Sequence, residues 1–224
     1  MKKLILLFAV AFNLNSNEFL TGSLVDYSGL IKMPNARFNN EGKVSFNYSR
    51  YDPYGKYVFQ FSPYNWFEGA LFYTDINSLG YPDFERGPGG MQSQKDKGFS
   101  LKARLFKEGE CYGLDYAFCE YLPNVAVGLV DFAGTSLTAS EYVVASKSFG
   151  RFDLTAGLGW GALGSTDNIG GNPLSILTDK FDQRGSGYSL GLMGGVPGVS
   201  TWFRGTTSVF GLSLIHISEP TRRT

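Results

Sequence analysis

The sequence predicts an all-β protein, in the form of an antiparallel up-and-down outer-membrane β-barrel of which this chain holds an incomplete, N-terminal part. Three observations predict it. Apolar residues recur at every second position, the predicted strands reach about nine residues, and short and long connections alternate between them. The composition agrees, because 29 glycines, 16% aromatic residues and only 18% charged residues are typical of chains with many turns and aromatic pleated surfaces.

The segment from Phe99 to Leu105 shows the alternation most clearly. Its odd positions are apolar, whereas its even positions are Ser100, Lys102 and Arg104. Side chains of a strand point alternately to its two faces, so one face meets an apolar environment and the other meets water. Strands are predicted in this way near residues 43–50, 57–62, 66–74, 98–106, 124–131, 140–149, 152–160, 187–193 and 200–207.

The connections between these strands favour a barrel over a soluble sandwich. Residues 62–65 and 150–151 form tight connections, whereas residues 75–97 and 161–186 are long and rich in Gly, Pro, Asp and Asn. In strict up-and-down order the tight pair and the long pair fall at opposite ends of the sheet, as in bacterial barrels with short periplasmic turns. A secreted, soluble β-sandwich that binds carbohydrate through its tyrosines stays open as the alternative.

The two ends of the chain differ from its middle. Residues 1–17 predict a signal peptide, with two lysines before an apolar run too short to span a bilayer as a helix. Residues 18–42 form an N-terminal segment and residues 43–211 the barrel domain. Residues 212–224 resemble translated sequencing-adapter sequence, and we expect them to be a non-native tail on a truncated chain.

Local motifs do not predict an enzyme. Ser189 lies in a G-x-S-x-G match, but it falls within an alternating strand, and the single histidine, His216, belongs to the suspect tail. No catalytic residue, metal site or cofactor is therefore expected. Basic and acidic residues balance at 20 each, so the sequence offers no basic surface for a nucleic-acid partner.

Cys111 and Cys119 are the two cysteines of the chain. An exported protein matures where thiols oxidise, so we expect these residues to form a local disulfide. Their hairpin connection falls on the predicted periplasmic side, which is an unusual place for a long insertion.

Polar and charged residues of the strands could line the interior of the barrel. A basic ladder in such a lumen would attract anionic polymer or lipid headgroups. The alternative is a solvated strand face on which Lys102 and Arg104 pair with Glu68 or Glu141. The lumen-facing candidates are Glu68, Ser100, Lys102, Arg104 and Asp153.

Several segments resemble the YjbH family of outer-membrane exopolysaccharide biosynthesis proteins. The matching runs are residues 29–37, 96–102, 122–129 and 140–161, of which the last is the most specific. The motif residues are Gly29, Leu30, Met33, Pro34, Arg37, Glu141, Tyr142, Ser146, Lys147, Gly157 and Trp160.

The resemblance implies a longer chain, a large barrel in the bacterial outer membrane, and a part in making or exporting an extracellular polysaccharide. Outer-membrane lipid, polysaccharide and other exopolysaccharide secretion proteins are the implied partners. Two departures exist. In the family a Glu-Gly pair is followed within a few residues by a Leu-Pro pair, whereas in this sequence the cysteine-bearing insertion separates the two pairs. Lipoprotein members of the family carry an N-terminal cysteine that this sequence does not have.

Overall fold

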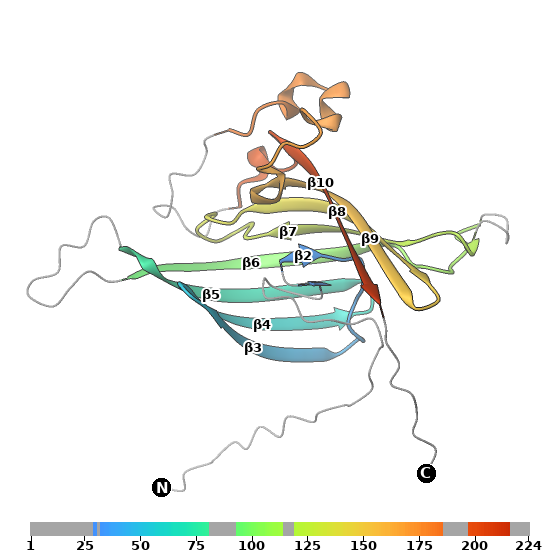
Figure 1. Cartoon of the computed structure of the whole chain (residues 1–224), viewed down its shortest axis with the longest axis horizontal. Helices are drawn as coiled ribbons and strands as arrows, with labels where there is room; N and C mark the ends of the chain where they lie inside the picture. Colours follow the sequence, from blue (N-terminus) through green and yellow to red (C-terminus); the bar gives the residue numbers. More distant parts are fainter. Residues whose placement is uncertain (1–28, 31, 81–92, 114–118, 186–196, 216–224) are drawn as a thin grey trace, which may run out of the picture.

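The fold, seen in a computed structural model that describes residues 29–30, 32–80, 93–113, 119–185 and 197–215, is built from two antiparallel sheets. The small sheet pairs β1 (Gly29–Leu30) with β2 (Met33–Pro34). The large sheet has eight strands in the order β10-β9-β8-β7-β6-β5-β4-β3 (Figure 1). Its strands are β3 (Lys43–Tyr51), β4 (Tyr54–Tyr64), β5 (Phe67–Gly80), β6 (Ser93–Phe106), β7 (Asn124–Val130), β8 (Ser140–Phe149), β9 (Phe152–Gly161) and β10 (Thr207–Ile215).

Each strand of the large sheet pairs with its neighbour in sequence, so the sheet is an up-and-down meander. The all-β prediction is confirmed, but the described sheet is open, with β3 and β10 as its two edges. Four short 3₁₀ helices lie in the described part, η1 (Ala162–Gly164), η2 (Pro173–Ile176), η3 (Asp179–Phe181) and η4 (Val199–Thr201). None of the helices among these residues is long and apolar enough to cross a membrane.

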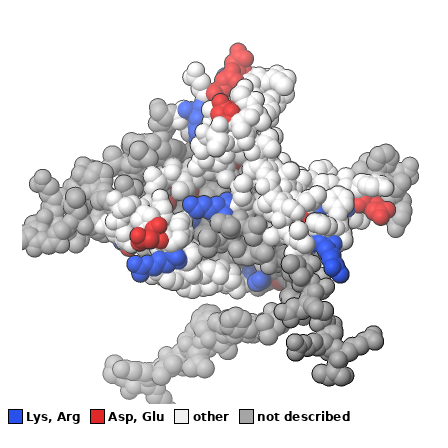
Figure 2. Space-filling model, viewed as in Figure 1, with Lys and Arg blue, Asp and Glu red and all other residues white. Residues whose placement is uncertain are grey.

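In a soluble protein the exposed face of a sheet is polar and the buried face is apolar. In this sheet the two faces are reversed. On one face, large apolar side chains are exposed in rows that cross the strands, such as Phe46 opposite Phe59, Phe59 opposite Leu71, and Leu71 opposite Phe99. The other face is buried and largely polar. Its buried polar residues include Lys56, Gln60, Glu68, Thr74, Asp96, Ser100, Lys102, Asn124, Ser146, Asp153 and Thr155. Charged groups on the face drawn in Figure 2 are few and scattered among uncharged atoms.

Two close approaches on the buried face require glycine. The ring of Tyr142 on β8 lies over Gly128 of β7, where an added Cβ would meet its ring atoms at 2.2 Å. Phe210 of β10 lies over Gly157 in the same manner, at 2.5 Å. The absence of side chains at these glycines lets two large aromatic rings fill the hollow of the sheet, beside Val58, Phe72 and Val144.

The first seven predicted strands are confirmed as β3 to β9, and the tight connections at residues 62–65 and 150–151 are confirmed as the β4–β5 and β8–β9 turns. The predicted strand at 200–207 is wrong. That segment contains η4 and positive φ angles at Phe203 and Gly205, which break an extended strand. The predicted strand at 187–193 and Ser189 lie outside the described residues, as does the predicted signal peptide.

The predicted boundary after Gly211 falls inside β10. Residues Leu212 to Ile215 continue the pairing with β9, opposite Thr155 to Phe152. The foreign origin of the tail stays a prediction.

Candidate functional site

The polar face of the sheet is occupied by the N-terminal segment, residues 33–40. Figure 1 shows β1 and β2 in front of the central strands. After Pro34, the side-chain oxygen of Asn35 accepts a hydrogen bond from the Arg37 N–H at 3.1 Å, which shapes a local turn. Asn35, Ala36 and Phe38 are buried. A segment far from the sheet in sequence therefore covers the face that carries the predicted lumen residues.

The segment contacts β8 and β9 through the hydroxyls of two facing residues. Ser146 lies opposite Thr155 in the sheet, and their hydroxyls are 2.7 Å apart. The Ser146 Oγ also accepts a hydrogen bond from the Ala36 N–H at 2.9 Å. Because Ser146 and Ala36 both belong to the motif-bearing runs, the structure brings two of these runs into direct contact.

Arg37 is the centre of a charged cluster at the end of the sheet that holds the β8–β9 turn. Its guanidinium donates to Asp153 Oδ2 at 3.1 Å, to Glu108 Oε2 at 2.6 Å and to Ser148 Oγ at 2.8 Å, and it also pairs with Asp153 Oδ1. Lys147 lies 3.2 Å from Glu108. Two cations and two carboxylates thus join the N-terminal segment, the cysteine-bearing connection and the β8–β9 hairpin.

The charges of this cluster shift one another's proton affinity. Burial alone lowers the pKa of Arg37, but the hydrogen bonds and charges of Asp153 and Glu108 outweigh it and raise that pKa above its ordinary value. Burial alone raises the pKa of Glu108. Hydrogen bonds from Arg37, the Ser148 N–H and Lys147 outweigh that effect, so the pKa of Glu108 lies below its ordinary 4.5. Both groups are therefore charged at neutral pH.

A second ion pair lies deeper on the same face. Glu68 of β5 and Lys102 of β6 are directly opposite in the sheet, 2.7 Å apart, and both side chains are 0% exposed. Asn39 donates from its backbone N–H (2.6 Å) and its side-chain amide (2.9 Å) to Glu68 Oε1. Lys102 Nζ donates to the carbonyl of Arg37 at 2.5 Å.

Phe38 contacts two of the basic residues of β6, Lys102 and Arg104. Its ring centroid is 4.3 Å from Lys102 Nζ and 4.4 Å from the Arg104 guanidinium carbon. Such cation–π contacts stabilise a cation that has lost water. The remaining predicted lumen residue, Ser100, accepts from the Asp131 N–H at 3.3 Å. All five predicted residues thus lie on one face, where Glu68, Lys102 and Asp153 hold the N-terminal segment.

The opposite end of the sheet holds three further motif residues. Arg184 donates to both oxygens of Glu141, at 2.6 and 2.9 Å, and the Phe203 N–H donates to the same carboxylate at 3.0 Å. The Trp160 indole N–H donates to Asn172 at 3.1 Å. Tyr142, next to Glu141 in the chain, is fully buried on the other face of the sheet, over Gly128. The contacts of Glu141 and Trp160 tie the long connection between β9 and β10 to the sheet.

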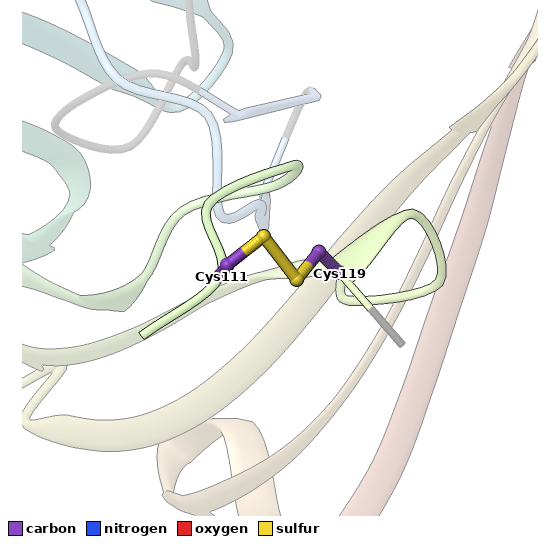
Figure 3. The surroundings of a disulfide bond; sticks show 2 residues. All are labelled: Cys111 and Cys119. Atoms are coloured by element: carbon purple, nitrogen blue, oxygen red, sulfur yellow. A yellow bond between two sulfur atoms is a disulfide. The ribbon is translucent and has the colours of Figure 1, made fainter. Parts of the chain in front are cut away.

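The disulfide candidates are joined in the structure. Cys111 and Cys119 form a bond within the connection between β6 and β7, on the same side as the tight turns (Figure 3). Lys147 of β8 donates to the backbone carbonyls of Glu120 and Leu122. The insertion is therefore covalently closed and fixed to the neighbouring strand.

The contacts described above hold the N-terminal segment and the connections against the sheet. Among the described residues, no group of three or more His, Cys, Asp and Glu side chains could hold a metal ion. The sequence pattern does not single out Glu108, Arg184 or Asn172. One feature of the sequence could have pointed to Glu108, because it belongs to the Glu-Gly pair of the family resemblance. Arg184 and Asn172 lie in a connection whose sequence has no periodicity.

Comparison with known proteins gives one family and one relative. A profile of the YjbH family, described as exopolysaccharide biosynthesis protein YbjH, matches residues 23–214. The chain is 41% identical over 183 residues to a protein of Escherichia coli (strain K12) named "Uncharacterized lipoprotein YjbH". The match covers 82% of this chain and 24% of that protein, so the chain spans about a quarter of the relative's length. No solved structure matches.

Proposed function

Because the chain belongs to the YjbH family of exopolysaccharide biosynthesis proteins, we propose that it is part of an outer-membrane β-barrel that helps to make or export an extracellular polysaccharide. The family assignment confirms the resemblance found in the sequence. In this proposal, residues 1–17 direct export across the inner membrane, and the protein acts as a conduit or a docking component and not as an enzyme.

The exposed apolar face is the observation that carries the proposal. Phe46 is 66% exposed and Phe59 is 42% exposed, and the neighbouring rows repeat the pattern across four strands. Soluble monomers rarely expose a continuous apolar surface of this kind, whereas the outer face of a membrane barrel is apolar and its inner face polar. Lipid is the environment that this combination fits best.

The strand lengths support the same environment. Four strands of the sheet belong to hairpins with tight turns whose residues are all described. These strands, β3, β4, β8 and β9, have 9, 11, 10 and 10 residues. A tilted strand needs about 9 to 11 residues to cross the hydrocarbon core. Aromatic side chains lie exposed at the tight-turn end, where Tyr64 stacks on Trp66 and where Phe149 and Phe152 flank the β8–β9 turn. Aromatic girdles at this level are typical of barrels.

In this proposal further strands close the barrel, because the described sheet is open at β3 and β10. Lipid offers no partner for the backbone groups of an open edge, so the edges at β3 and β10 must be paired within a membrane. The remaining length of the longer relative would supply those strands. The polar face, with Glu68, Lys102 and Asp153, would then face the lumen and hold residues 33–40 inside it.

A soluble sandwich would cover the apolar face with a second sheet. The small β1–β2 sheet lies instead on the side of the polar face, through the contacts of residues 36–39. The soluble alternative therefore gains no support from a described element.

The experiment that tests the proposal uses the longer protein in its own bacterium. Phe59→Arg places a charge on the apolar face and costs about 2 to 4 kcal/mol in lipid. Asn65→Arg, in the exposed β4–β5 turn, is the matched control. We expect Phe59→Arg to lower both the protein in the outer-membrane fraction and the polysaccharide released, and the control to change neither. Recovery of wild-type protein without detergent, or normal polysaccharide from a deletion strain, would overturn the proposal.

A further inference from the structure

The β1–β2 hairpin and the N-terminal segment that continues it follow the hollow of the large sheet along its strands. At one end, Lys32 in the hairpin turn lies with its Nζ 5.0 Å from the ring centroid of Tyr51 and 5.9 Å from that of Tyr54. These tyrosines are paired beside the β3–β4 turn, at the end of the sheet opposite the β4–β5 turn. At the other end, Arg37 is bound to Asp153, next to the β8–β9 turn. The chain is therefore held near both ends of the sheet.

The same stretch also reaches from one edge of the sheet to the other. Lys32 lies over β3 and β4 at one edge, whereas β2 contacts β10 at the other edge. Met33 packs against the apolar cluster that includes Phe210 of β10, and Ala36 and Phe38 belong to that cluster. Figure 1 shows β1 and β2 over the middle of the sheet. Contacts at both ends and both edges place this stretch across the hollow of the polar face.

The stretch is attached to the large sheet by separate contacts and not by strand pairing. Among the described strands, β1 and β2 pair with each other in a sheet of their own. The hydrogen bonds to the large sheet described above come from Ala36, from the Arg37 side chain and carbonyl, and from Asn39. Hydrogen bonds of this kind contribute little net free energy when water can replace the partner. In a polar lumen, these contacts can therefore be broken without breaking the sheet.

Several polar groups of this region are left unsatisfied while the stretch is in place. The side-chain nitrogens of Asn35 and Gln60 and the hydroxyl of Ser62 are buried without a hydrogen-bond partner among the described residues. Buried polar groups normally have a partner, and leaving one without a partner costs stability. The closed arrangement is therefore less stable than a fully satisfied core, which favours a segment that can leave.

We propose that the β1–β2 hairpin and the N-terminal segment form a releasable plug of the lumen, an inference that rests on the proposed function. With the plug in place, the lumen is closed to the polymer. Release breaks the pairing of Arg37 with Asp153 and the bonds from Asn39 to Glu68, while Lys102 stays paired with Glu68. The plug leaves toward the end with the tight turns, because β3, to which it is joined, begins at that end.

The first test is the ion conductance of the full-length protein in planar lipid bilayers. Arg37→Ala removes the guanidinium that holds the plug, and we expect the fraction of time in the open state to rise at least tenfold, a change that corresponds to about 1.4 kcal/mol. Arg50→Ala, an exposed arginine of β3, is the matched control and should behave as the wild type does. An open fraction that is the same in the wild type and in Arg37→Ala overturns the plug.

A crosslink tests the same plug in the opposite direction. Ala36→Cys and Ser146→Cys place two thiols where the Ala36 N–H now bonds the Ser146 hydroxyl at 2.9 Å. Added to Arg37→Ala, the oxidised pair should return the open fraction to within about threefold of the wild type, and a reductant should raise it again. The same reductant on Arg37→Ala alone controls for the native disulfide. A crosslinked protein that stays open, or cysteines that do not join when Arg37 is intact, overturns the plug.

Polysaccharide release shows whether the plug must leave. With Arg37 intact, cells that carry both cysteines should release at least about fivefold less polysaccharide than cells that carry either cysteine alone, at equal amounts of protein in the outer membrane. Equal release from crosslinked and single-cysteine proteins overturns the inference.

The outcomes separate the plug from the function on which it rests. A wild-type protein that fractionates as soluble overturns the proposed function and the plug together. A protein in the outer membrane whose conductance responds neither to Arg37→Ala nor to the crosslink overturns the plug alone.

Discussion

Replacing Lys102 with methionine tests the structure at a fully buried charge. Lys102→Met keeps the length and most of the packing of the side chain but removes the ammonium that pairs with Glu68. Glu68 then remains as a carboxylate at 0% exposure, still accepting two hydrogen bonds from Asn39 but without its counter-charge. The carbonyl of Arg37 also loses the hydrogen bond from Lys102.

The expected loss follows from this geometry. Removing one partner of a buried ion pair destabilises a protein by about 3 to 5 kcal/mol, because the other charge stays buried. Adding Glu68→Gln removes that charge while keeping an acceptor for Asn39. The double variant should therefore be more stable than Lys102→Met alone by about 1 to 3 kcal/mol.

The assay is urea unfolding of the full-length protein in phospholipid vesicles, followed by tryptophan fluorescence. Lys97→Met is the matched control, because Lys97 lies on the same strand but is exposed, and it should change the unfolding free energy by less than about 0.5 kcal/mol. If Lys102→Met is no more destabilising than Lys97→Met, the buried pair and the N-terminal segment above it do not exist as described.

Three further predictions concern other parts of the molecule. The pKa of Glu108 is lower in the folded state than its ordinary 4.5, so its stabilising contribution is complete above that value and is lost as pH falls through the folded pKa. Unfolding free energy measured between about pH 3 and pH 7 should therefore fall on acidification, and less steeply in Glu108→Gln; an unchanged slope would contradict this. Gly128→Val forces a side chain into the Tyr142 ring and should cost at least about 1 to 3 kcal/mol in urea titrations, whereas Gly185→Val, with no atom within 4 Å of its added Cβ, should cost little; equal losses would refute the close approach. Replacing Cys111 and Cys119 together by serine opens a loop with a separation of 8 residues and should lower stability by about 2 to 3 kcal/mol, and a reductant should then have no further effect on the urea midpoint; a reductant effect that persists in the double variant would contradict it.

Strand positions were predictable from the sequence because alternation is a local property. Phe99 to Leu105 encodes both its conformation and its two faces within seven residues, and the same holds for β3 to β9. Alternation also predicted that Glu68, Ser100 and Lys102 share a face. The prediction from alternation is wrong at residues 200–207. There, positive φ angles at Phe203 and Gly205 interrupt the extended backbone that a strand requires.

The occupant of the polar face could not be predicted, because it depends on contacts across long sequence separations. Ala36 and Ser146 are 110 residues apart, and Arg37 and Asp153 are 116 apart. No periodic signal links such residues. The contact between Arg184 and Glu141 has the same origin, since Arg184 lies in the connection between β9 and β10, whose sequence shows no alternation, and meets Glu141 only in the folded sheet.

Spin labels on two adjacent residues of β3 test the central claim, that the apolar face meets lipid and the polar face meets water. Phe46→Cys and Asn47→Cys place labels on opposite faces of one strand, at positions that are both exposed. In the full-length protein in vesicles, the label at residue 46 should collide mainly with oxygen dissolved in lipid and the label at residue 47 with a water-soluble nickel chelate. Equal access of the chelate to both labels would contradict the account.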